Sequence, residues 1–231
     1  MIILNDDKLL NYYIKKHEIE TLFDTDMKQH MTLVQYDRGE DILVAGDSMP
    51  YFFLIVEGKA KIFRTLENGK SVLLRFTRPL SELGSLELLH EKRIVDSEVQ
   101  SIYGVTAIRI PFEDLEEVTK HDVTFLRYIV SRLSTKLETA SKAASLNASY
   151  PFKNRFASYL ISLTRIDSVQ RIDEINFDKL TDLATFLGTS YRHLNRVIQT
   201  FEKEGMIVKK DKKFIILDYQ KLEDLAGGYY E

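Results

Sequence analysis

Residues 179–205 read KLTDLATFLGTSYRHLNRVIQTFEKEG and decide the fold of the C-terminal part of the chain. Apolar residues recur there at i, i+3, i+4 and i+7 in two sets, the pattern of two short helices that each bury one face. The sets are Leu180, Leu183, Ala184, Leu187 and Leu194, Val197, Ile198, Phe201. Between them, Gly188 suits a left-handed helix end and Ser190 suits an N-cap. Two short helices joined by such a turn predict a helix-turn-helix.

The opposite face of the second helix carries guanidinium and amide groups, which can hydrogen-bond to base edges in a major groove. An ordinary solvated helix face mixes Glu with Lys, but no acidic residue lies between Asp182 and Glu202. We therefore favour DNA recognition, with Arg192, Asn195 and Arg196 reading bases. Tyr191 and His193 are expected to contact phosphate or a thymine methyl group. The expected DNA contacts of this segment are Thr189, Ser190, Tyr191, Arg192, His193, Asn195, Arg196 and Gln199.

A basic hairpin follows the two helices. The β-type runs 206–208 and 214–217 flank four lysines, which are Lys209, Lys210, Lys212 and Lys213. From residue 188 to residue 213 there are seven Lys or Arg and three Asp or Glu, so a local charge of +4 stands in a chain of net charge −3. Two short strands with a lysine-rich tip predict a wing that contacts the phosphate backbone.

The N-terminal half has a different residue pattern. Two short helices are expected over 7–17 and 18–31, and glycine-punctuated β runs follow. These runs are 33–36, 42–44, 51–56, 60–63, 71–76, 95–101 and 104–110. Asn68-Gly69 between two of them is a strong hairpin signal because both residues tolerate positive φ. This spacing predicts a compact antiparallel sandwich or barrel.

A heptad seam follows residue 112. Its apolar residues alternate at spacings of 3 and 4 and are Val123, Leu126, Val130, Leu133, Leu137, Ala140 and Ala144. β-branched residues at a positions with Leu at d favour a parallel two-stranded coil, so we expect a dimer interface. The alternative is a long helix that packs only on its own sheet. We favour the dimer, because the strict spacing exceeds what simple burial needs and because Phe125 and Ile129 give the helix a second apolar face for its own sheet. The helix is expected to end near Asn147, with a hinge at Pro151.

Composition narrows the function classes. Of the 231 residues, 44% are hydrophobic, and none is Cys, which excludes disulfides, thiolate metal sites and a cysteine nucleophile. The chain has no G-x-S-x-G, G-x-G-x-x-G or P-loop motif, and its five His residues are scattered. We therefore expect no enzyme and no cofactor or metal. The chain lacks an 18-residue apolar run, and its N-terminus turns acidic at once without a basic signal region. A cytoplasmic protein without membrane contact is expected.

The assembled order resembles the CRP/FNR family, that of the cyclic-AMP receptor protein and the fumarate–nitrate regulator, over nearly the whole chain. Residues 81–84 (Ser-Glu-Leu-Gly) resemble the family's Gly-Glu-Leu-Gly phosphate cassette, and Arg93 lies near its phosphate arginine. Residues 187–194 resemble the YeiL-type branch. Four of the glycines match the turn glycines of the family's β-roll: Gly39, Gly46, Gly58 and Gly69. The resemblance implies an α+β chain: a cyclic-nucleotide-binding-like β-roll (jelly roll), a dimerisation helix and a winged helix-turn-helix, over 1–112, 113–149 and 150–231.

Departures from the family pattern concern the effector. Ser81 replaces the cassette's first glycine, and Arg93-Ile94-Val95 replaces Arg-Ser/Thr-Ala one residue late, which removes a phosphate contact. Arg93 could equally be a surface residue or pair with Glu82. The second helix of the helix-turn-helix lacks the family's Arg-Glu pair, so the family's usual DNA half-site does not carry over. The cysteines that hold an oxygen-sensing cluster in one branch of the family are absent. The residues that would form an effector pocket are Ser81, Glu82, Leu83, Gly84 and Arg93.

The resulting prediction is a homodimeric transcription regulator that binds a pseudo-palindromic operator in double-stranded DNA without depending on cyclic AMP. The resemblance also suggests RNA polymerase and an unidentified small-molecule effector as partners. Two alternatives stay open. One is a cyclic-nucleotide-responsive activator, and the other is a ligand-binding module whose helix-turn-helix face meets protein rather than DNA.

Overall fold

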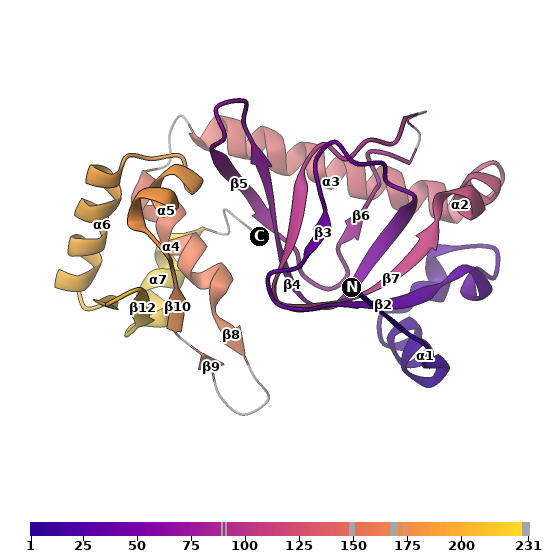
Figure 1. Cartoon of the computed structure of the whole chain (residues 1–231), viewed down its shortest axis with the longest axis horizontal. Coiled ribbons are helices and arrows are strands. Elements are labelled where there is room, and N and C mark those ends of the chain that lie inside the picture. The colour runs from indigo at the N-terminus through magenta and orange to yellow at the C-terminus, as the bar shows by residue number, and fades with distance from the viewer. Residues whose placement is uncertain (89, 91, 148–150, 167–170, 173, 228–231) are drawn as a thin grey trace. The chain divides into compact units, whose positions relative to one another are not determined.

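The computed structural model describes residues 1–231 apart from 89, 91, 148–150, 167–170, 173 and 228–231. The chain divides into two compact units (Figure 1). The first unit comprises residues 1–64 and 76–142, and the second comprises 65–75 and 143–231. The predicted boundaries at residues 112 and 149 stay a prediction. Among the described residues, no helix is both long enough and apolar enough to cross a membrane.

The N-terminal part of the chain forms a seven-stranded sheet with order β1-β2-β7-β4-β5, to which β3 adds on β7 and β6 adds on β4. Antiparallel pairing, which the glycine-punctuated runs predicted, joins β2 to β1 and β7, β7 to β3 and β4, and β4 to β6. We call this sheet the roll. Its strands are β1 (Ile2–Leu4), β2 (Thr32–Tyr36), β3 (Asp41–Leu43), β4 (Tyr51–Thr65), β5 (Ser71–Phe76), β6 (Glu82–Leu83) and β7 (Glu98–Pro111).

Two of these strands are longer than predicted. The runs 51–56 and 60–63 are one strand, β4, and the runs 95–101 and 104–110 merge into β7. The pairing of β4 with β7 shifts register beside Gly58, where the strands bulge. Gly58 and Gly104 both have positive φ, and a Cβ at Gly58 would collide with the carbonyl oxygen of Gly104. These glycines therefore allow a close backbone approach inside continuous strands rather than ending them.

The N-terminal segment differs from the prediction in part. Helix α1 (Asp7–Lys16) begins after Asp6, whose carboxylate accepts hydrogen bonds from the amides of Lys8 and Leu9. The prediction of a helix over 18–31 is wrong, because this segment forms only two short 3₁₀ turns, η1 (Ile19–Leu22) and η2 (Lys28–His30). Strand β1 was not expected. Its three residues are too few to show an alternating pattern, and β2 pairs with it.

Two helices follow β7, namely α2 (Phe112–Thr119) and α3 (Val123–Asn147), and α3 runs along the roll (Figure 1). Residues 148–150, which follow Asn147 directly, lie outside the described residues, so the expected end of this helix near Asn147 stays a prediction. Phe125 and Ile129 are buried in the core of the roll, as expected. Val123, Val130 and Leu137, which are a positions of the heptad, are exposed.

The second unit forms around Phe156 of α4 (Phe152–Leu163), whose ring lies 5.6 Å from those of Phe201 and Phe214. α4 ends at Leu163, and three short strands follow it before the next helix. The remaining elements are β8 (Arg165–Ile166), β9 (Arg171–Ile172), β10 (Glu174–Asn176), α5 (Leu180–Phe186), α6 (Tyr191–Lys203), β11 (Ile207–Lys210), β12 (Lys213–Ile216) and α7 (Tyr219–Ala226). Of the expected hinge, residues 148–150 lie outside the described residues, and Pro151 is the N-cap of α4.

Candidate nucleic-acid interface

The turn between α5 and α6 has the predicted geometry. Gly188 has a φ of +64°, and its amide donates to the carbonyl of Thr185. The amide of Thr189 donates to the carbonyl of Ala184 at 2.8 Å, which closes the end of α5. Ser190 caps α6, since its hydroxyl accepts the amide of His193 at 3.2 Å. The two helices are thus held by local hydrogen bonds that the sequence signals anticipated.

The inner face of α6 is the buried one. Its buried residues are Leu194, Val197, Ile198 and Phe201, and α5 contributes Leu183, Ala184 and the following Leu187. Arg155 of α4 adds a contact that the sequence analysis missed. Its Nη1 donates to the carbonyl of Leu187 at 3.2 Å, and its guanidinium lies over the ring of Phe152. α4 is therefore bonded directly to the turn that orients α6.

The outer face of α6 is polar and open to solvent. Arg192, Arg196 and Gln199 are exposed, as is Tyr191 in the first turn, whereas Asn195 is half-buried. The face therefore presents two guanidinium groups and an amide side by side, along about two turns of a helix whose opposite side is anchored. This arrangement fits the wide groove of a DNA duplex.

His193 is placed differently from its neighbours. Its ring centroid lies 5.1 Å from that of Phe152, and its Nδ1 is 3.4 Å from the hydroxyl oxygen of Thr189. The imidazole is half-buried between α4 and the turn. Its main contacts are therefore internal, in contrast to the phosphate or methyl contact expected from the sequence.

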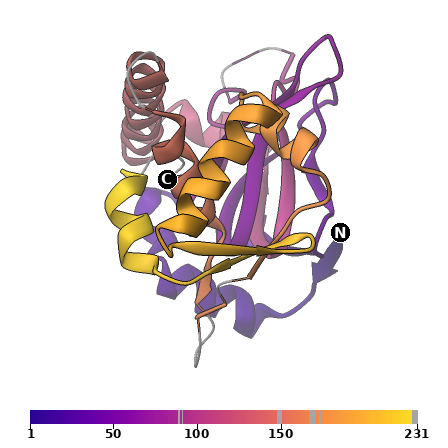
Figure 2. The ribbon, with the colours of Figure 1, turned by 90° about the vertical axis from the view of Figure 1, so that its left-hand side faces the viewer.

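The wing is a hairpin of β11 and β12, with β10 as a third strand (Figure 2). Asp211 at its tip has a φ of +50°, and the four wing lysines are exposed. The amide of Lys209 donates to Oε1 of Glu202 at 2.9 Å, which joins the base of the wing to the last turn of α6. No pattern in the sequence indicated this contact of Glu202. The bond sets the lysines beside the recognition helix.

The cassette residues Ser81 and Glu82 bond to other residues of the chain. Glu82 is 1% exposed, and its two carboxylate oxygens bond to Arg132 Nε at 2.8 Å and Lys136 Nζ at 2.7 Å. Ser81, which stands where the family has glycine, accepts the amide of Arg78 on its hydroxyl at 3.1 Å. Leu83 and Gly84 are buried beside them.

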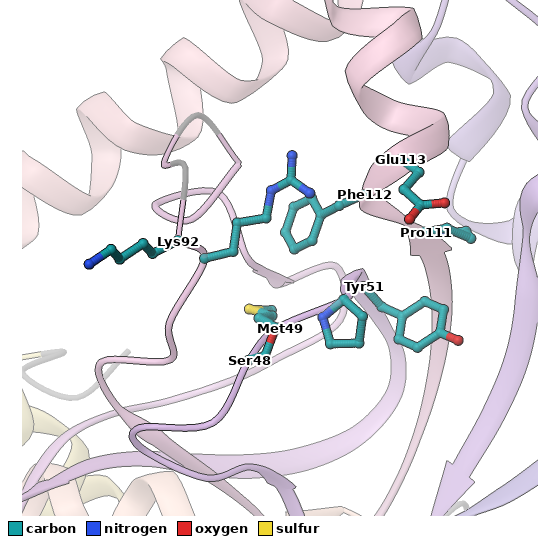
Figure 3. Close-up of a pocket in the computed structure, with 9 residues that line it drawn as sticks. Ser48, Met49, Tyr51, Lys92, Pro111, Phe112 and Glu113 are labelled. Atoms are coloured by element: carbon teal, nitrogen blue, oxygen red, sulfur yellow. The ribbon is translucent and has the colours of Figure 1, made fainter.

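Arg93 takes a partner that was not considered. Its guanidinium pairs with Glu116 of α2 and lies 4.9 Å from the ring of Phe112. The structure thus pairs Glu82 with α3 and Arg93 with α2, and does not join them in a single cradle. Arg93 lines a pocket of about 490 Å³, in which Lys92 and Glu113 lie on opposite sides of Phe112 in the view of Figure 3.

Comparisons with known proteins agree with this architecture. Residues 33–122 match the cyclic nucleotide-binding domain, and residues 154–225 match the Crp-like helix-turn-helix domain. The chain is 28% identical to the regulatory protein YeiL of Escherichia coli O157:H7 over 207 residues, covering 88% of this chain and 90% of that protein. It is 24% identical to the transcriptional activator anr of Pseudomonas aeruginosa, covering 84% of this chain and 80% of that protein.

Solved structures share the fold. TTHB099, a transcriptional regulator of the CRP family from Thermus thermophilus, superposes with a TM-score of 0.65 at 17% identity, covering 86% of this chain and 98% of that one. FixK2 from Bradyrhizobium japonicum gives a TM-score of 0.62 at 16% identity, covering 84% of this chain and 96% of that one.

Proposed function

The chain belongs to the CRP/FNR family of DNA-binding transcription regulators, and we propose that it acts as a homodimer that reads a pseudo-palindromic operator through α6. The observation that carries this proposal is the outer face of α6. Arg192, Arg196 and Gln199 are exposed there on a helix whose inner side is buried and whose N-terminus is capped by Ser190. Arginine and amide side chains at this spacing can read guanine and adenine edges.

The remaining contacts divide by chemistry. Asn195 lies on the base-facing side of α6 but is half-buried, so it reaches a base edge only where the helix enters the groove deeply. Tyr191, Thr189 and Ser190 surround the N-terminus of the helix, where amides attract phosphate. The four wing lysines would hold the backbone beside it. His193 would act through packing against Phe152.

Exposed apolar residues on α3 support the dimer. Val123, Val130 and Leu137 are 54%, 62% and 72% exposed, and they recur every seven residues on one side of the helix. Leu126 and Leu133 at the d positions are half-buried, and Ala140 is exposed. The side chain of Ala144 lies outside the described residues. Pairing two such helices in parallel would bury this stripe and set two recognition helices about one DNA turn apart.

The contacts of the cassette support independence from cyclic AMP. The Glu82 carboxylate already accepts from two cations, and Arg93 already pairs with Glu116. The match of residues 33–122 to the cyclic nucleotide-binding domain favours the alternative, a nucleotide-responsive activator. Calorimetry with cyclic AMP and cyclic GMP separates the two, since heat of binding near physiological concentrations would favour the alternative. We also propose an effector other than a cyclic nucleotide and a contact with RNA polymerase, but we assign no residues to either.

Selection of duplexes from a random pool tests the function. We expect enrichment of an inverted repeat whose half-sites lie one helical turn apart, bound by a species of twice the chain mass. If the selected duplexes share no common sequence and do not differ from the starting random pool, base reading is rejected and the protein-interaction alternative is favoured. Repeating the selection with Arg196→Ala should lose the preference at one position of each half-site.

A further inference from the structure

A polar cluster joins the roll to α3 in the first unit. Arg132 and Lys136 are one turn apart on α3, and both reach the buried carboxylate of Glu82 on β6. Lys136 also donates from Nζ to the hydroxyl of Ser85 at 2.6 Å, and that hydroxyl lies 3.4 Å from Oε1 of Glu82. The Lys136 side chain is 19% exposed, so the ammonium group is largely withdrawn from water. We call Glu82, Ser85, Arg132 and Lys136 the latch cluster.

The charges of the latch cluster are mutually dependent. Burial by itself raises the pKa of Glu82, but the cations of Lys136 and Arg132 outweigh burial and hold that pKa below its ordinary value. Glu82 is therefore ionised when the cluster is intact. Removing Lys136 would leave the carboxylate paired with Arg132 through Oε2, but the buried Oε1 would lose its charged donor, which costs stability.

α3 presents a polar stripe to the roll at i, i+4 and i+8. Tyr128 precedes Arg132 by one turn, and its hydroxyl is buried without a hydrogen-bond partner among the described residues. Phe125 and Ile129 lie beside this stripe in the core of the roll. Apolar packing alone allows a helix to slide or rotate, whereas two charged side chains on one carboxylate fix both its rotation and its register.

The same helix carries the proposed dimer seam. Val130 is exposed between the turns that contribute Phe125 and Arg132, so the orientation of α3 on the roll sets the direction in which the seam points. A ligand in the roll of a regulator acts by changing this orientation only if it makes different contacts in the two states. In this chain, Arg132 and Lys136 themselves make the contacts between α3 and the roll that a ligand would otherwise make.

We propose that the latch cluster is a built-in substitute for a bound effector, which fixes α3 on the roll and thereby holds the dimer in its DNA-binding form without a ligand. This inference rests on the proposed function. Arg132 and Lys136 are positioning residues, since they act on DNA affinity through the orientation of α3. Loosening the cluster should weaken DNA binding even where the chain keeps its stability.

The test compares three full-length variants. Lys136→Met removes one cation, and Glu82→Gln with Lys136→Met removes the buried charge together with that cation. Lys120→Met is the matched control, because Lys120 forms an exposed ion pair with Glu117 on α2. Affinity for the selected duplex is measured by fluorescence anisotropy without nucleotide, alongside the thermal midpoint and amide hydrogen exchange over residues 130–141.

We expect Lys136→Met to weaken DNA binding at least tenfold and to speed exchange in α3. The double variant should regain most of the thermal midpoint, because it buries no carboxylate and the Arg132 side chain, which is 34% exposed, can be solvated. It should nevertheless keep the weak binding and fast exchange. Lys120→Met should match the wild type. If Lys136→Met does not fold, the double variant carries the test.

Recovery of wild-type affinity in the double variant would overturn the proposal, since the cluster would then serve stability alone. Tightening of wild-type DNA binding by cyclic AMP would also overturn it. If the wild type selects no duplex, the proposed function fails instead. In that case hydrogen exchange decides about the latch, and unchanged exchange in the variants would reject it.

Discussion

Asp24 and Asp122 each accept a hydrogen bond from the segment of chain that contains the other. Oδ2 of Asp122 accepts the amide of Asp24 at 2.7 Å, and Oδ1 of Asp24 accepts the hydroxyl of Thr124 at 2.7 Å. Oδ1 of Asp122 also accepts the amide of Phe125 at 2.8 Å, which caps the start of α3. The pair therefore ties the N-terminal segment to the first turn of the helix that bears the dimer seam.

Replacing Asp122 should destabilise the fold. Asp122→Ala removes the helix cap and the acceptor of the Asp24 and Phe125 amides, so we expect a loss of about 1–3 kcal/mol in the free energy of unfolding. Urea denaturation measures the loss. Asp6→Ala, which removes the exposed cap of α1, is the matched control and should cost less. An Asp122→Ala variant as stable as the wild type would contradict the structural role of this carboxylate.

Arg196 should carry sequence preference. Arg196→Ala should cost about 1–3 kcal/mol on the selected operator and much less on random duplexes, because base-edge hydrogen bonds act only at the matching base. Competition binding against both kinds of DNA measures the difference. Equal losses on the two would assign Arg196 to the phosphate backbone instead.

Lysines at the wing should set salt dependence. Each phosphate contact releases counterions, so neutralising Lys210 and Lys212 together should reduce the slope of log affinity against log salt by about 2. Titrations between low and physiological salt on operator and random duplexes measure the slope. Lys120→Gln, at the residue that follows α2, is the control and should leave the slope unchanged. A wing variant with the wild-type slope would show that the wing does not touch DNA.

The exposed seam of α3 should control assembly. Leu137→Glu introduces a charge at an a position that is 72% exposed in the single chain, so the chain should stay folded while the dimer dissociates. Mass in solution and circular dichroism report the two properties separately. Leu217→Glu, at an exposed leucine of the second unit, should leave the mass of the dimer intact. A dimeric Leu137→Glu variant would place the interface elsewhere.

The Glu82 carboxylate should make stability depend on pH in one direction. Its pKa is lower in the folded chain than its ordinary value of 4.5, so its stabilisation is present above about pH 4.5 and is lost as pH falls through the folded pKa. The difference in unfolding free energy between wild type and Glu82→Gln should therefore shrink from pH 7 to about pH 3.5. A constant difference would mean that charge plays no part in this contact.

Sequence patterns determined those parts of the protein that depend on near neighbours along the chain. The turn around Gly188, the Ser190 cap and the buried and exposed faces of α6 all follow from spacings of three and four residues, because one helix turn brings those positions together. The place of the wing lysines around the tip of a hairpin followed from the β-type runs on either side of them.

Contacts between distant segments were decided only by the tertiary structure. Glu82 meets Arg132 across 50 residues, and no local period links a carboxylate in one segment with a cation on a later helix. Likewise, Gly58 and Gly104 read as strand ends, although their backbones cross closely inside continuous strands. His193 was expected to contact DNA from the first turn of α6, yet its ring packs against Phe152 of another helix. Local periodicity specifies which face of an element is buried, whereas packing in three dimensions selects what covers it.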